Sequence, residues 1–280
     1  MPSAIHEVAL YLRAHPVPVV RGRGAGVLAP WDRSNEILAV AGRPVVLTSF
    51  GPYVTPALFH AAERAWRGDA EALASFMVRA DAGHVVTGIR YYMKIRDVPG
   101  RGPLLDGPRG RSTPDPAFLR AHPAAVLWTG GGGIPDEGVA HARHFMPVFA
   151  GREPVPGVDP AGPTLWVYER VPGARVGGHA PTGARVTATV ALVLRGVARP
   201  WVAWTVAEND RYELVLPLPT GLNTGSIRTG ERYVLHVGGV VAGSLTVPLE
   251  TVRGGARVDP VIGSSETTAQ SSARNSPRRP

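Results

Sequence analysis

A chain of 280 residues with 44% hydrophobic residues is long enough for two ordinary domains with buried cores. The absence of cysteine excludes disulfides, thiolate nucleophiles and cysteine-based zinc sites. The net charge of +8 is spread along the chain, without the interleaved aromatic and basic residues of single-strand binders, and this argues against nucleic-acid binding. The 34 glycines and 28 prolines favour turns and β-structure over long helices.

The first part of the chain, residues 1–150, alternates between predicted helices and strands. Apolar spacing predicts helices at 4–14, 35–41, 55–68 and 69–82, and strands at 27–29, 44–50 and 84–95. Crossovers of this kind give parallel strands. We therefore predict a small mixed α/β domain with parallel strands. Residues 97–116, rich in proline, glycine and arginine, are expected to form a mobile loop, followed by a short helix and a strand from residue 124.

From Thr164 the pattern changes to strict alternation of apolar and polar residues. About eight short runs, separated by glycine, proline or asparagine turns, predict an antiparallel β-sandwich over residues 164–258. Residues 259–280 have no apolar period and are predicted to be a disordered tail. The fold class is thus α/β plus all-β.

The stretch from Gly26 to Val54 is the most informative one for function. It reads as strand, turn, helix and strand, and it places Trp31 and Asp32 where the first strand ends and the helix begins. In parallel α/β sheets ligands collect at that edge, because helix N-termini and free backbone donors converge there. The simpler interpretation is packing by Trp31 with Asp32 or Ser34 as the helix cap, and both interpretations remain open.

Other candidate sites are weaker. The run Gly130 to Gly133 lacks the lysine of a phosphate loop and is followed by Pro135, so we predict a turn. His141 and His144 have no third ligand nearby, so a metal site is not expected.

In the sandwich, His179 and His236 are isolated and are interpreted as strand residues. Trp201 and Trp204 fall on opposite sides of the pleat, or nearly so. One of the two is therefore a candidate for contact with a sugar, and core packing is the preferred interpretation for Trp204.

The stretch 26–54 resembles the start of the extracytoplasmic globular region of oligosaccharyltransferase catalytic subunits from archaea and some bacteria. In that family a Trp-Trp-Asp-Tyr-Gly motif precedes a helix and a Gly-Arg-Pro-Val-Val strand. The aligned residues here are Pro30, Trp31, Asp32, Arg33 and Ser34. The family motif recognises the hydroxyl residue of an Asn-X-Ser/Thr acceptor, so the resemblance implies substrate binding by Trp31 and Asp32, the two positions that match.

Two further stretches bear on this resemblance. The run from Pro172 to Pro181 resembles the start of the carboxypeptidase-regulatory-like, transthyretin-type sandwiches that end many such subunits. The family's second acceptor motif has no clear counterpart, since Met93-Lys94-Ile95 has the wrong spacing.

The resemblance implies the soluble portion of an oligosaccharyltransferase-like membrane glycosyltransferase, which contributes acceptor-peptide recognition for protein N-glycosylation but is not catalytic alone. A divalent metal and a lipid-linked oligosaccharide are implied only for a complete family member, and no cofactor is expected in this chain. The implied partners are a membrane-embedded transferase region or an acceptor peptide, with glycan contact as a further interaction.

The implied location is the extracytoplasmic side of a membrane if the chain is joined to a membrane half. The sequence itself shows no signal peptide and no stretch near the ~20 apolar residues of a membrane span, and so predicts a soluble chain otherwise. The alternative function is a non-enzymatic envelope module that binds glycan or protein.

Overall fold

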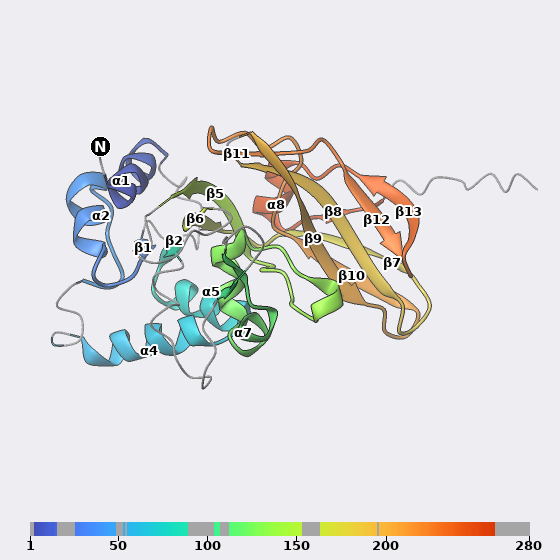
Figure 1. Cartoon of the computed structure of the whole chain (residues 1–280), viewed down its shortest axis with the longest axis horizontal. Coiled ribbons are helices and arrows are strands. Elements are labelled where there is room, and N and C mark those ends of the chain that lie inside the picture. Colours follow the sequence, from blue (N-terminus) through green and yellow to red (C-terminus); the bar gives the residue numbers. More distant parts are fainter. Residues whose placement is uncertain are drawn as a thin grey trace, which may run out of the picture.

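The structure, a computed structural model, describes residues 3–15, 26–48, 53, 55–88, 104–106, 112–152, 163–194 and 196–260. It combines a mixed α/β part with a β-sandwich, as the sequence predicts, and the two parts lie next to each other along the long axis of the molecule (Figure 1). The predicted disordered tail lies outside the described residues beyond residue 260.

The first sheet organises the α/β part. Its strands, in order across the sheet, are β1 (Gly26–Leu28), β2 (Ala82–Gly88), β6 (Leu165–Arg170) and β5 (Phe145–Gly151). The parallel pair is β1 and β2, whereas β6 runs antiparallel to both of its neighbours. The chain thus builds the parallel half first and completes the sheet with strands that come much later in the sequence.

Helices α1 (Ala4–Ala14) and α2 (Ser34–Ala41) pack against each other on one side of this sheet (Figure 1). The helix predicted at 4–14 is confirmed, and the hydroxyl oxygen of Ser3 accepts a hydrogen bond from the backbone N–H of His6 at 3.2 Å. α2 ends at Gly42, whose φ of 63° lies in the left-handed region that glycine adopts without strain.

The other side of the sheet is covered by helices α4 (Pro56–Arg67), α5 (Ala70–Arg79) and α7 (Pro116–Ala121) and by the 3-10 helix η2 (Pro123–Thr129) (Figure 1). The carboxylate of Asp69 caps α5 by accepting a hydrogen bond from the N–H of Ala72 at 2.6 Å. With helices on both faces, every residue of β2 and the first five residues of β6 are buried.

The stretch predicted as a strand from residue 124 is instead η2. Pro123 at its first position has a backbone angle suited to a helix and needs no hydrogen-bond partner for its nitrogen. Every residue from 124 to 128 is buried. The prediction is wrong because a continuous apolar run does not by itself distinguish a buried helix from a buried strand.

Three further segments predicted in the α/β part differ in extent from the observed elements. The expected loop at 97–116 contains a short antiparallel hairpin of β3 (Leu104–Asp106) and β4 (Ser112–Pro114). The strand expected at 44–50 contributes a single parallel bridge to β1. The strand expected at 84–95 is β2, and residues beyond Gly88, including Met93-Lys94-Ile95, lie outside the described residues.

The larger sheet of the sandwich is centred on β8 (Arg185–Leu194). It pairs with β9 (Val197–Val206) on one side and with β12 (Tyr233–Val237) and β11 (Ile227–Thr229) on the other, and β13 (Val240–Leu245) follows β12. All of these pairs are antiparallel. Every second residue of β8 is buried, as the alternation predicts.

The smaller sheet of the sandwich contains β10 (Arg211–Leu216), β7 (Ala174–His179) and the short β14 (Arg257–Val258). β14 follows helix α8 (Leu249–Gly254) and runs parallel to β7. The turn at 209–210 leads from β9 to β10, and its φ angles of 52° and 56° give the twist that suits a tight β-turn between strands.

One strand that the sequence assigns to the sandwich lies in the first sheet instead. The run that begins the alternating region is β6, which the sequence assigns to the sandwich but which sits between β2 and β5 in the first sheet. Its first five residues are all buried, because helices cover both faces of that sheet. The assignment to the sandwich is wrong because apolar content alone does not show which sheet a buried strand joins.

The connecting segment, residues 130–143, leads from η2 along β9 towards β5. The N–H of Gly133 donates a hydrogen bond to the backbone of β9 at 2.8 Å, and the ring nitrogen of Trp201 donates to the carbonyl of Gly130 at 3.1 Å. A Cβ on Gly133 would lie 2.8 Å from the ring of Trp204. The predicted turn is therefore confirmed, and its glycines allow backbone to pack directly on two tryptophans.

Candidate functional site

The Trp31 turn, residues 30–34, joins the carboxyl end of β1 to α2. The carbonyl of Pro30 accepts one hydrogen bond from the N–H of Arg33 at 2.9 Å and another from the hydroxyl of Ser34 at 3.1 Å. Ser34 is fully buried, so these bonds fix the turn against the core. Trp31 lies on the outer side of the turn and is 37% exposed.

Asp32 does not cap α2, so the capping interpretation is wrong. The helix begins at Ser34, the N-cap position is Arg33, and none of the described side chains caps it. Ser34 does not cap it either, because its hydroxyl donates back to the carbonyl of Pro30. The side chain of Asp32 is 41% exposed and its Oδ2 lies 3.9 Å from Nε of Arg33. Both predicted binding residues are thus at the surface and next to each other in the turn.

The Trp31 turn lies at the edge where the parallel strands β1 and β2 both end. β6 begins at the same edge, because Leu165 is paired with Gly88 at the end of β2. A Cβ on Gly88 would lie 2.6 Å from the carbonyl oxygen of Thr164, so backbone approaches backbone closely there. The structure places the turn where the sequence argument expects ligands to collect.

His141 and His144 point to different partners. Nε2 of buried His141 donates to the carbonyl of Val215 at 2.9 Å, and Nδ1 accepts from the N–H of Trp204 at 3.3 Å. Burial lowers the pKa of His141 to about 4, so its ring is neutral at pH 7. Nδ1 of His144 lies 3.1 Å from the carbonyl of Pro172. Across the described ranges, no group of three histidine, aspartate or glutamate side chains is placed to hold a metal ion.

His179 and His236 lie in strands β7 and β12, as predicted. In β9, the prediction that Trp204 packs in the core is wrong. Trp201 is 2% exposed and faces the core, whereas Trp204 is half-buried on the opposite face beneath the connecting segment. The pairing between β8 and β9 explains this, because it sets Trp201 opposite a buried residue of β8 and Trp204 opposite a half-buried one.

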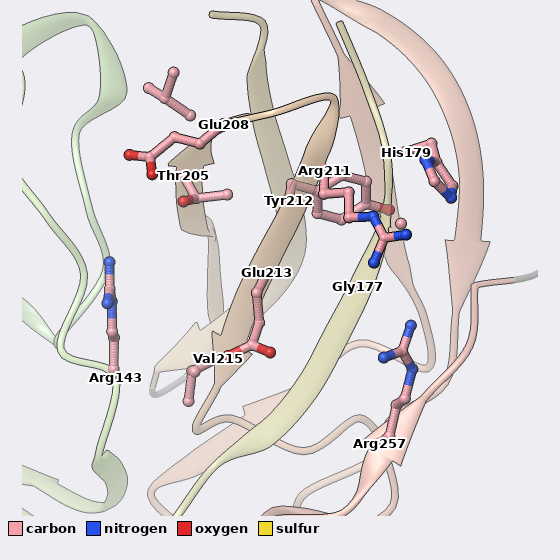
Figure 2. A pocket seen from close by; sticks show the side chains of 12 residues that line it. Arg143, Gly177, His179, Thr205, Glu208, Arg211, Tyr212, Glu213, Val215 and Arg257 are labelled. Carbon is pink, nitrogen blue, oxygen red and sulfur yellow. The ribbon is translucent and has the colours of Figure 1, made fainter. Parts of the chain in front are cut away.

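A groove of about 650 Å³ on the sandwich, drawn in Figure 2, was not predicted. Its charged side chains come from the connecting segment, the end of β9, β10 and β14: Arg143, Glu208, Arg211, Glu213 and Arg257. The signal in the sequence that could have indicated this groove is the spacing of Arg211 and Glu213. They are two residues apart, which puts both on the same face of a strand.

Comparisons with known proteins give consistent results. Residues 173–258 match the family model of the archaeal glycosylation protein B (AglB) long peripheral domain. The fold is similar to solved structures of an oligosaccharyltransferase from Archaeoglobus fulgidus, each with 14% identity and 92% of this chain covered. The TM-score is 0.64 for the complex with zinc and sulfate, 0.66 for AglB with an inhibitory peptide and a dolichol-phosphate, and 0.65 for the form tethered to an acceptor peptide containing the NVT sequon.

The resemblance to oligosaccharyltransferase subunits that the sequence indicates is confirmed by these matches. This chain spans between 42% and 46% of the length of those solved chains. A comparison with curated proteins finds no match. Among the helices of the described ranges, none combines the length and apolar character required to cross a membrane.

Proposed function

We propose that this chain is the extracytoplasmic peripheral portion of an oligosaccharyltransferase-like membrane glycosyltransferase. The family match over residues 173–258 and the fold similarity over most of the chain support this proposal. Since the chain spans less than half of the similar solved chains, the transfer reaction is assigned to the rest of a complete protein. The divalent metal and the lipid-linked oligosaccharide that the family implies belong there too.

Within that protein, the Trp31 turn contributes to binding of the acceptor peptide for N-glycosylation. The observation that carries this proposal is the exposure of Trp31 beside Asp32 at the carboxyl edge of β1 and β2. The indole offers an apolar face to the threonine methyl group of an Asn-X-Thr peptide, and the carboxylate can accept a hydrogen bond from its hydroxyl.

The test is a titration of an Asn-Val-Thr peptide into the wild-type chain and the Trp31→Ala variant. The matched control is Leu38→Ala, which removes an apolar side chain that is 45% exposed on the adjacent helix α2. We expect the wild type and the control to bind alike and Trp31→Ala to lose at least about tenfold in affinity. A peptide with valine in place of threonine should bind weakly to all three proteins, because it lacks the hydroxyl. Absence of binding to the wild type, or equal binding to Trp31→Ala, would contradict the proposal.

The second candidate is a non-enzymatic envelope module. The observation that favours it is Arg33, which stands where the family motif has tyrosine and whose Nε lies 3.9 Å from the Asp32 carboxylate. The native size of the polypeptide separates the two candidates. An immunoblot band far above 29.6 kDa in the membrane fraction supports the transferase, whereas a soluble band near 29.6 kDa supports the module.

A further inference from the structure

The groove of Figure 2 is shaped by two consecutive glycines in β7, although glycine weakens a strand interior. A Cβ on Gly178 would lie 2.6 Å from the hydroxyl oxygen of Tyr212, so any side chain there would displace the phenol. A Cβ on Gly177 would lie 3.1 Å from a guanidinium nitrogen of Arg257. The glycine pair thus lets Tyr212 pack on one face of β7 and Arg257 lie across the other.

Most of the charged side chains of the groove form no hydrogen bond or ion pair with the residues that the structure describes. Within the described residues, the side chains of Arg143, Arg211, Glu208 and Glu213 make no hydrogen bond or ion pair. Arg257 forms an ion pair with Asp259 at 3.3 Å, but both side chains are mostly exposed. Water screens exposed pairs of this kind, so they contribute little and a ligand can replace this one.

Positively and negatively charged side chains line the same groove. Arg211 and Glu213 project from the same face of β10, and the strand register places them opposite His179 and Gly177. In Figure 2, Glu213 is seen between Arg143 on the connecting segment and the side of the groove that carries Arg257. A ligand in the groove therefore meets guanidinium donors as well as carboxylate acceptors.

We propose that this groove binds an oligosaccharide that carries carboxylate groups. Guanidinium groups pair with carboxylates through two parallel hydrogen bonds, and glutamate carboxylates accept hydrogen bonds from sugar hydroxyls. A ligand with only negative groups would be repelled by Glu208 and Glu213, and a neutral sugar would offer no opposite charge to Arg143 and Arg211. The proposal is independent of peptide binding at the Trp31 turn.

The test is calorimetric titration of the full chain with a tetramer of galacturonic acid. Two comparison ligands separate the features of the proposal: the carboxyl-reduced, neutral tetramer, and tetraglutamate, which has carboxylates but no sugar hydroxyls. We expect the uronate tetramer to bind at least about tenfold more tightly than either. Equal binding of the neutral tetramer overturns the role of the carboxylates, equal binding of tetraglutamate overturns the role of the sugar, and no binding of the uronate tetramer overturns the site.

Two variants place the binding in the groove. Arg211→Ala removes an exposed side chain of the groove, and Arg228→Ala removes an exposed arginine of β11 outside it. We expect Arg211→Ala to lose about tenfold in affinity for the uronate tetramer and Arg228→Ala to bind like the wild type. Equal losses in the two variants would show general charge attraction and overturn the assignment to the groove.

Discussion

Two charge pairs tie the sandwich to the rest of the molecule, and they differ mainly in their surroundings. Glu169 of β6 accepts two hydrogen bonds from Arg253 of α8, at 2.7 and 3.0 Å, and the glutamate side chain is 4% exposed. Asp136 of the connecting segment lies 2.6 Å from Arg185 of β8, but the aspartate side chain is 92% exposed. Because water screens the second pair much more than the first, the two should differ widely in their effect on stability despite similar distances.

The buried pair lies among other polar side chains that are held neutral. Burial, and then the charge of Glu169, raise the pKa of Tyr11 to about 12. Burial, and then the charges of Arg43 and Arg253, lower the pKa of His84 to about 3. Nδ1 of neutral His84 can accept a hydrogen bond from Nη2 of Arg43 at 3.4 Å. The buried junction is thus a set of polar groups that depend on one another.

The largest effect is expected from Glu169→Gln. The substitution keeps the shape of the side chain but leaves the guanidinium of Arg253 without its carboxylate. We expect the free energy of unfolding to fall by about 3 kcal/mol, at the lower end of values for broken buried pairs, because Arg253 is itself 34% exposed and can reach water. Urea denaturation of the wild type and the variant measures this difference.

A double variant sharpens this prediction. Replacing both partners, with Glu169→Leu and Arg253→Met, removes the two charges together and fills the space with apolar groups. We expect the double variant to be more stable than Glu169→Gln, since no unpaired charge remains. A double variant as unstable as the single one would mean that packing at β6, and not the charge pair, holds the junction.

The second-largest expected effect on folding stability depends on pH. It concerns His141, which lies between the connecting segment and the sandwich. Its pKa is about 4 in the folded chain against a usual value of 6.5, so between these values the unfolded chain binds more protons. The stability due to neutral His141 is therefore full above pH 6.5 and is lost as the pH falls towards 4. At pH 5 the loss is about 2 kcal/mol.

Urea denaturation at pH 7 and pH 5 tests this for the wild type and His141→Gln. The variant is expected to be less stable at pH 7, because it loses the bonds to Val215 and Trp204. Its further loss between the two pH values should be smaller than that of the wild type by about 2 kcal/mol. Other titrating groups, including His84, are present in both proteins and cancel. Identical pH dependence would show that His141 does not remain neutral.

The sandwich strands and the Trp31 turn were predictable because their signals are local. Alternation along β8 follows directly from the burial of one face, and Gly42 marks the end of α2 in the sequence. The place of β6 was not predictable, because its partners in β2 and β5 are set by tertiary packing and a buried strand shows no alternation.

Predicting the groove of Figure 2 would have required the same kind of long-range information. Arg143 and Arg257 lie 114 residues apart in the chain, and no local pattern indicates that they line one space. The exposure of Asp32 also required the structure, since the simpler interpretation of the sequence was that Asp32 or Ser34 caps α2.

The smallest effect is expected at the exposed pair of Asp136 and Arg185. A double-mutant cycle with Asp136→Asn and Arg185→Ala is needed, because Arg185 also lies 6.0 Å from the ring centroid of Trp204 and its removal alone would mix two contributions. We expect a coupling energy of at most about 1 kcal/mol from urea denaturation, falling further when salt is added. A coupling as large as the effect of Glu169→Gln would mean that water does not screen this pair, and that exposure is not what separates the two junctions.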